Sequence, residues 1–93
     1  MSPVDDETYI DIFTAFLEGR CGTADMFASY WSAYSEDKRV DDLALYGILQ
    51  KVFYVMEEYE SDPELRSRDS PSEGDVRETV TKAKAALEAR RTL

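Results

Sequence analysis

At 93 residues the chain is long enough for one hydrophobic core but too short for two domains, so we expect a single domain spanning residues 1–93. Hydrophobic residues make up 43% of the chain and charged residues 33%, a balance that excludes both a disordered tail and a membrane protein. Twenty acidic and eleven basic side chains give a formal net charge of −9, which repels nucleic acid and attracts basic surfaces.

Residues 1–7 lack the basic segment and apolar run of a secretory signal, so we expect a cytoplasmic protein. The single cysteine, Cys21, cannot form an internal disulfide, as is ordinary in a reducing compartment. No apolar run approaches the roughly 18 residues that a membrane-spanning helix needs. The sequence therefore predicts no membrane partner.

Two amphipathic helices are predicted in the first third of the chain. Ser2 is the expected cap of the first helix, which ends at Gly19, and Thr23 is the expected cap of the second. Their apolar faces consist of Tyr9, Ile12, Phe13, Phe16 and Leu17, and of Met26, Phe27, Tyr30, Trp31 and Tyr34. An aromatic stripe at this spacing indicates core packing more often than a ligand site.

The third predicted helix begins after Asp41, with Val40 and Leu45 placed for a hydrophobic staple, and runs to about Glu60. Apolar residues cover most of its circumference, which predicts a central position in the bundle. Its narrow polar strip consists of Gly47, Lys51, Tyr54 and Glu58.

Residues 61–72 change to Ser, Pro, Asp and Arg, and Leu65 is expected to anchor this connection to the core. The fourth helix begins at Ser70 or Ser72, and its last residues, 90–93, are expected to fray. Its buried stripe is predicted to be Val76, Val80, Ala83 and Leu87. Four amphipathic helices without a strand pattern predict an all-α fold, an antiparallel up-and-down four-helix bundle.

Catalytic and metal-binding motifs are not found. The chain has no histidine, the commonest general base and transition-metal ligand, so Cys21 has no partner to make it a nucleophile. Adjacent carboxylates such as Glu57 and Glu58 point in different directions on a helix, and neither a calcium loop nor a glycine-rich phosphate cradle occurs. We therefore expect no enzyme, no cofactor, no metal and no nucleic-acid ligand.

Acidic residues are concentrated between Glu57 and Glu78, a stretch that contains nine of the twenty acids and only three arginines. Tyr54 lies one turn before this stretch on the polar side of its helix, and tyrosine is enriched at binding hot spots. One interpretation is an acidic surface for a basic partner. The alternative is a solvated loop flanked by acids that favour a helix start.

Three segments carry a resemblance: FTAFLEG at 13–19, TADMF at 23–27 and DPELR at 62–66, the last followed by a final amphipathic helix. Together they resemble the colicin D immunity protein family, also described as self-protective colicin-like immunity proteins. The resemblance implies a small antiparallel four-helix bundle that blocks the nuclease domain of a toxin that cleaves transfer RNA. It also implies an inhibitor without catalytic activity.

For this chain the resemblance and the charge pattern predict that partner contacts are made by Glu58, Asp62 and Glu64, with support from Tyr54, Glu57 and Asp69. The predicted function is a monomeric immunity protein that covers the basic active site of a cognate tRNase-type toxin. Two alternatives remain open: a homo-oligomeric helical module joined through exposed aromatics, and an acidic nucleic-acid mimic that regulates a DNA-binding protein.

Overall fold

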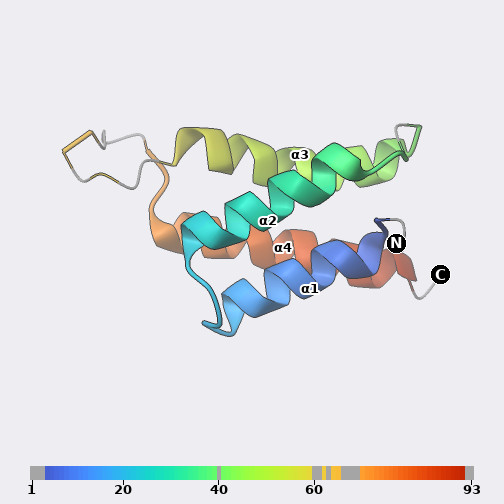
Figure 1. Cartoon of the computed structure of the whole chain (residues 1–93), viewed down its shortest axis with the longest axis horizontal. Helices are drawn as coiled ribbons and strands as arrows, with labels where there is room; N and C mark the ends of the chain where they lie inside the picture. The colour runs from blue at the N-terminus through green and yellow to red at the C-terminus, as the bar shows by residue number, and fades with distance from the viewer. Residues whose placement is uncertain (1–3, 40, 60–61, 63, 66–69, 92–93) are drawn as a thin grey trace.

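The computed structural model describes residues 4–39, 41–59, 62, 64, 65 and 70–91, and these form four helices and no strand. The helices are α1 (Asp6–Leu17), α2 (Thr23–Glu36), α3 (Leu43–Glu58) and α4 (Glu73–Arg91). Successive helices run in opposite directions (Figure 1), which confirms the antiparallel up-and-down four-helix bundle. We call the end where α1 begins and α4 ends the terminal end, and the end where α3 leads to α4 the loop end.

α1 has a well-defined signal at each boundary. Asp5 caps its start, accepting a hydrogen bond from the Thr8 backbone while Thr8 Oγ1 accepts one from the Asp5 backbone. The predicted cap Ser2 lies outside the described residues. At the other boundary Gly19 takes a φ of 80°, which lets Arg20 N–H reach the Ala15 carbonyl at 2.8 Å in a Schellman motif.

α2 begins differently from the prediction. Gly22 is its N-cap and makes no capping bond through a side chain, so the prediction of Thr23 as the cap is wrong. Thr23 is instead the first helical residue, and its hydroxyl donates to Glu73 Oε1 at 3.1 Å. This bond ties the start of α2 to the start of α4, a use for Thr23 that helix-capping patterns cannot reveal.

α3 is capped by Asp42, whose side chain accepts from Leu45 N–H at 3.0 Å, so the prediction of Asp41 is wrong by one residue. Adjacent aspartates compete for this position, and Asp42 is the one that pairs with Arg90 of α4. Val40, half of the predicted staple, and Glu60, the predicted last residue, lie outside the described residues.

α4 is capped by Ser72, which settles the choice between Ser70 and Ser72. Ser72 and Asp75 exchange reciprocal backbone-to-side-chain bonds of 3.1 and 2.9 Å, a capping box. The expectation of a frayed carboxyl end is wrong for Arg90, which forms ion pairs with two aspartates. Thr92 and Leu93 lie outside the described residues.

All four helices contribute to one hydrophobic core. The buried hydrophobic residues are Tyr9, Ile10, Phe13 and Phe16 of α1, Met26, Tyr30 and Ala33 of α2, Leu45, Leu49 and Val52 of α3, and Val76, Val80, Ala83 and Leu87 of α4. The predicted stripe of α4 is therefore confirmed in full. On α2, Met26 and Tyr30 are buried as predicted, but Trp31 is not.

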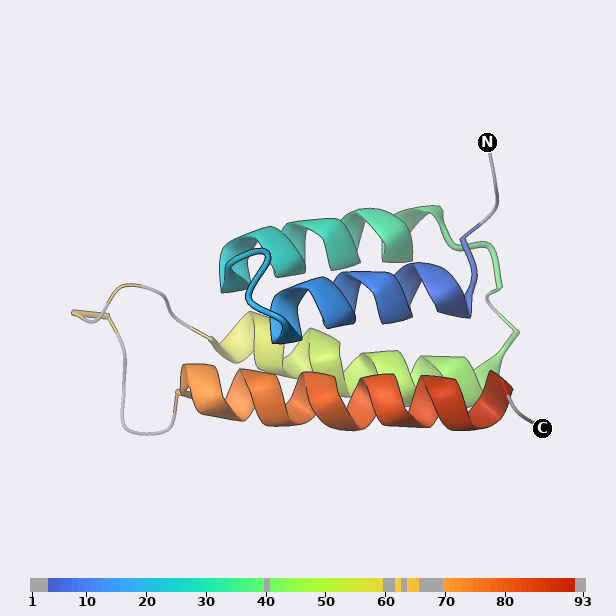
Figure 2. The same cartoon turned by 90° about the horizontal axis from the view of Figure 1, so that it is seen from below.

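The prediction that α3 is the central helix is wrong. α1 packs against α2 and α4, and α4 packs against α1 and α3, whereas no backbone packing of similar extent joins α2 to α3 (Figures 1 and 2). Only Leu45, Leu49 and Val52 of α3 are buried. Its remaining apolar residues are partly or fully exposed because no helix covers the outer flank of α3.

The prediction that Leu65 anchors the connection before α4 is also wrong, since Leu65 is 69% exposed. The described part of this connection is held by its own backbone instead. Asp62 accepts bonds from Glu64 N–H through its side chain and from Leu65 N–H through its carbonyl, each 3.0 Å long. This local turn needs no hydrophobic anchor.

Candidate partner-binding surface

An arginine network closes the terminal end of the bundle. It joins three aspartates from α1, the α2–α3 connection and the start of α3 to two arginines, Arg39 and Arg90. The N–O distances are 2.7 Å for Arg39–Asp6, 2.9 Å for Arg39–Asp37, 2.8 Å for Arg90–Asp6 and 2.5 Å for Arg90–Asp42. These three carboxylates thereby share two guanidinium groups within the fold.

Burial and hydrogen bonding show that the arginine network is structural. The Asp37 carboxylate is only 8% exposed and accepts a 2.8 Å bond from the hydroxyl of fully buried Tyr9. Burial raises the pKa of Asp37, but hydrogen bonds from Arg39 and Tyr9 outweigh it and hold that pKa below its ordinary value. Hydrogen bonds from Arg90 and from Leu45 N–H likewise lower the pKa of Asp42.

The predicted acidic contacts lie at the opposite, loop end. Glu57 and Glu58 are exposed in the last turn of α3, and Asp62 and Glu64 are exposed in the connection that follows. Glu57, Glu58 and Glu64 form no ion pair with any residue that the structure describes. We call these three residues the loop-end glutamates. Asp69 lies outside the described residues, so its predicted role stays a prediction.

The other described acids of the 57–78 stretch have roles within the fold. Glu73 accepts from Thr23, Asp75 accepts from the backbone of the cap Ser72, and Glu78 pairs with Lys82 at 3.1 Å across one turn. The interpretation as helix-start acids therefore fits the beginning of α4, whereas it does not account for the loop-end glutamates. The acidic stretch thus divides into two parts with different local chemistry.

Arg77 lies among these acids but serves α1. Its guanidinium donates to the Leu17 carbonyl at 2.7 Å and lies 5.3 Å from the centre of the Phe16 ring. A cation at the carboxyl end of a helix satisfies a free carbonyl and favours the helix dipole. Although Arg77 is surrounded by acids in the sequence, its guanidinium therefore contacts α1 instead of these acids.

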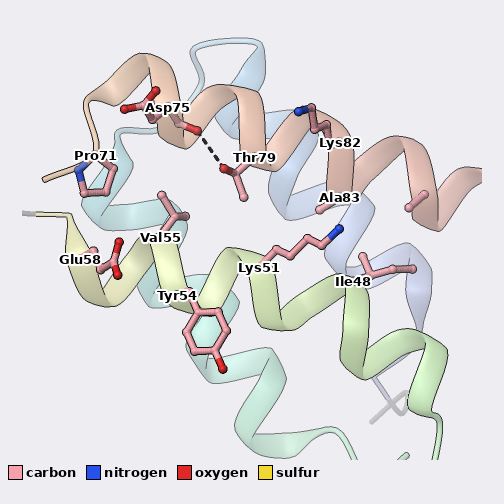
Figure 3. Close-up of a pocket in the computed structure, with 11 residues that line it drawn as sticks. Ile48, Lys51, Tyr54, Val55, Glu58, Pro71, Asp75, Thr79, Lys82 and Ala83 are labelled. Atoms are coloured by element: carbon pink, nitrogen blue, oxygen red, sulfur yellow. Dashed lines mark hydrogen bonds between the residues drawn. The ribbon is translucent and has the colours of Figure 1, made fainter. Parts of the chain in front are cut away.

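A groove of about 570 Å³ runs between α3 and α4 (Figure 3). Its apolar lining comes from Ile48 and Val55 of α3 and from Ala83 and Ala86 of α4. Glu58 and Asp75 line its loop end, but Lys51 and Lys82 line it further along. The groove is therefore electrically mixed, and only its loop end belongs to the acidic surface.

Tyr54 has a place that the sequence only partly predicted. It lies on the rim of this groove but its ring points away from α4 (Figure 3), and the centroid of the Phe53 ring lies 6.2 Å from its own. We use the term aromatic face for the exposed Trp31, Tyr46 and Tyr54 together with the half-buried Tyr34 of α2 and Phe53 of α3. Trp31 and Tyr34 were predicted to be core, whereas Tyr54 was predicted to lie on the polar strip.

One sequence signal could have revealed the exposure of Trp31. At about 100° per residue, Tyr30 lies roughly 40° and Trp31 roughly 140° around the helix from Met26, so Trp31 lies at the far edge of the predicted stripe. Tyr30 is buried and donates its hydroxyl to the Leu49 carbonyl at 2.9 Å, which leaves Trp31 at the edge of the bundle. The predicted aromatic residues of α2 cover a wider arc of the helix than its buried face. The width of this stripe, and not its spacing, therefore indicates that one of them lies outside the core.

Other kinds of site find little support in the described part of the chain. Cys21 is a free, half-buried thiol in the turn between α1 and α2. The residues that the structure describes include no group of three or more metal-ligating side chains. None of their helices combines the length and the apolarity that a membrane span requires.

Comparison with known proteins identified no matching family model, no matching curated protein and no matching solved structure. The resemblance to colicin D immunity proteins therefore stays a prediction. Arguments about function rest on the loop-end glutamates, the aromatic face and the arginine network.

Proposed function

We propose that this chain is an immunity-type inhibitor that binds the basic nuclease domain of a tRNase-type toxin and blocks its active site. One observation carries the proposal: the loop-end glutamates are exposed and form no ion pair among the described residues, whereas Asp6, Asp37 and Asp42 are held by arginines. The loop end thus presents exposed carboxylates that no arginine among the described residues holds.

Electrostatics favours a basic partner at this place. Glu57 and Glu58 repel one another and add to a net charge of −9, so a cationic surface that approaches the loop end relieves repulsion as well as gaining attraction. Opposite charges of this kind steer encounter and make association fast and strongly dependent on salt. Repulsion by the same field disfavours nucleic acid as the ligand.

A nuclease is the basic partner that fits the proposal best. An enzyme that cleaves RNA must carry cations that hold phosphate groups, and exposed carboxylates can occupy the same cationic positions. The resemblance of residues 13–19, 23–27 and 62–66 to colicin D immunity proteins points to the same class of partner. Inhibition by occlusion needs no catalytic group on this chain.

The proposal is tested with candidate basic tRNase-type toxin domains, assayed for transfer-RNA cleavage with and without the purified protein. We expect a stoichiometric complex, loss of cleavage, and an affinity that falls steeply as salt is raised. The double variant Glu57→Lys/Glu58→Lys is expected to weaken inhibition at least 100-fold, in line with close charge pairs across interfaces.

A matched control separates position from total charge. Asp11 and Glu36 are exposed and engage in no ion pair with described residues, so Asp11→Lys/Glu36→Lys changes the net charge equally. We expect this control to inhibit nearly as well as the unaltered protein. Equal inhibition by the two double variants, or a toxin that cleaves RNA at full rate in the presence of this chain, would overturn the proposal.

A further inference from the structure

The aromatic face exposes an unusual amount of aromatic surface. Trp31 is 48% exposed, Tyr46 50% and Tyr54 53%. Trp31 stacks on Tyr34 and on Phe53 with ring centroids 5.9 Å apart in both pairs, which makes one continuous surface across α2 and α3. Exposed aromatic area of this kind is typical of a binding surface, because tryptophan and tyrosine dominate interface hot spots.

Packing between α2 and α3 accounts for only some of the residues of the aromatic face. Stacking of Trp31 on Phe53 holds α2 against α3, where close backbone packing is limited. Tyr46, however, makes no hydrogen bond through its hydroxyl and no ring contact with any described residue, and Tyr54 bonds only to Gln50 on its own helix. These two tyrosines therefore contribute little to holding the bundle together.

The aromatic face is continuous with the loop-end glutamates. On α3, Tyr46 and Phe53 are seven residues apart and share one side of the helix. Glu57 follows Phe53, and Glu58 follows Tyr54, by four residues each, so the carboxylates extend the aromatic row by one turn. A partner that contacts the glutamates from this side also meets the aromatic rings.

We propose that the aromatic face is the centre of the partner interface and that it receives arginine side chains of the basic partner. This inference rests on the proposed function and specifies the partner's chemistry. A guanidinium stacks flat on an aromatic ring and donates paired hydrogen bonds to a carboxylate, whereas a lysine ammonium is more strongly hydrated and lacks the planar fork. A second copy of this chain would bring its own charge of −9 to the same surface.

Trp31 is the chain's single tryptophan and reports directly on this face. The probe is a nonapeptide of arginine, compared with a nonapeptide of lysine, titrated into the full chain while tryptophan emission is recorded. We expect the arginine peptide to shift Trp31 emission and to bind at least fivefold more tightly than the lysine peptide. The lysine peptide is expected to bind through charge alone, with little change in emission.

Double variants separate the contribution of the aromatic rings to peptide binding from that of the carboxylates. Tyr46→Ala/Tyr54→Ala is expected to abolish the preference for arginine while leaving helicity and thermal unfolding nearly unchanged. Glu57→Gln/Glu58→Gln is expected to weaken both peptides by a similar factor. Asp11→Asn/Glu36→Asn is the control of equal charge and is expected to bind both peptides nearly as tightly as the unaltered protein.

The outcomes separate this inference from the proposed function. Equal binding of both peptides, weakened equally by the glutamate variant and unaffected by the tyrosine variant, overturns the aromatic contact and leaves the acidic surface in place. Binding of neither peptide contradicts both. Concentration-dependent dimerisation in sedimentation equilibrium, with a shift in Trp31 emission and no peptide present, identifies a second copy as the occupant and overturns an arginine-bearing partner.

Discussion

The two ends of the bundle use the same acidic residue types for different purposes. At the terminal end three aspartates lie against Arg39 and Arg90, with Tyr9 donating a further hydrogen bond. At the loop end the glutamates are exposed, and none forms an ion pair with a described residue. Position relative to the arginines, and not composition, separates acids that support the fold from acids that are free to bind.

The net charge of the chain does not reveal how charge is distributed between the two ends. Both arginines of the network belong to the eleven basic residues of the chain, yet the fold brings them to one end from positions 39 and 90. At the terminal end three aspartates therefore share two arginines, whereas no described cation pairs with the loop-end glutamates. Substitutions in the arginine network are expected to reduce stability more than binding. Substitutions of the loop-end glutamates are expected to reduce binding more than stability.

The largest loss of stability is expected for Arg39→Met, which removes the cation between Asp6 and Asp37. Breaking a buried pair from one side costs roughly 3–5 kcal/mol, and partial exposure of Arg39 reduces this to about 2 kcal/mol. Urea unfolding measures the loss. Arg20→Met, which removes an exposed pair with Glu18, is expected to change stability by less than about 0.5 kcal/mol. Equal losses would contradict a structural role for the network.

A somewhat smaller loss is expected on acidification, because protonated carboxyls keep part of their hydrogen bonding. The folded-state pKa values of Asp37 and Asp42 lie below their ordinary values. Their contribution to stability is therefore complete above the unfolded-state pKa of about 3.9 and is lost as pH falls through the folded-state values.

Urea unfolding at a series of pH values from 5 down to 2 measures this acid effect. The double variant Asp37→Asn/Asp42→Asn is expected to show a shallower decline over the same range, since it lacks both titrating carboxyls. An identical decline in the variant would mean that other carboxyls control the acid sensitivity.

A loss of about 1 kcal/mol is expected for Tyr9→Phe, which deletes one hydrogen bond to Asp37 and keeps the packed ring. Thermal unfolding measures it. Tyr54→Phe, which deletes a bond to Gln50 on an exposed surface, serves as the control and is expected to be nearly neutral. A neutral Tyr9→Phe would show that Arg39 alone satisfies Asp37.

The smallest effect on stability is expected for Glu57→Gln/Glu58→Gln. These side chains are exposed and unpaired among the described residues, so their neutralisation is expected to change the free energy of unfolding by less than about 0.5 kcal/mol. Urea unfolding in low salt checks this. A loss of more than about 1 kcal/mol would give these glutamates a structural role and remove the contrast between the two ends.

Local sequence patterns predicted the positions of the helices well, but they predicted less well which faces of the helices are covered by neighbouring helices. Helical spacing identified all four helices and the complete buried stripe of α4, because period and burial are coupled along one helix. The same spacing made α3 look central, since apolar residues cover most of its surface. Which of them face the core depends on where α1 and α4 lie, and sequence spacing carries no information on that.

The candidate site shows the same division. The glutamates of the last α3 turn were predicted because they are clustered in sequence. The arginine network was not predicted, since its members lie at positions 6, 37, 39, 42 and 90 and meet only in the folded chain. The exposure of Tyr54 was predicted from its place on the polar strip, whereas the exposure of Trp31 was missed because its helical spacing was interpreted as core packing.

The central claim is that the loop end, and not the terminal end, receives a basic partner. Titration of the isotope-labelled protein with the lysine nonapeptide, followed through backbone amide resonances, tests it most directly because the probe carries charge alone. We expect the largest shifts at Glu57, Glu58 and Glu64, with little change at Asp37 and Asp42. Shifts of equal size at both ends, or larger shifts within the arginine network, would contradict the account.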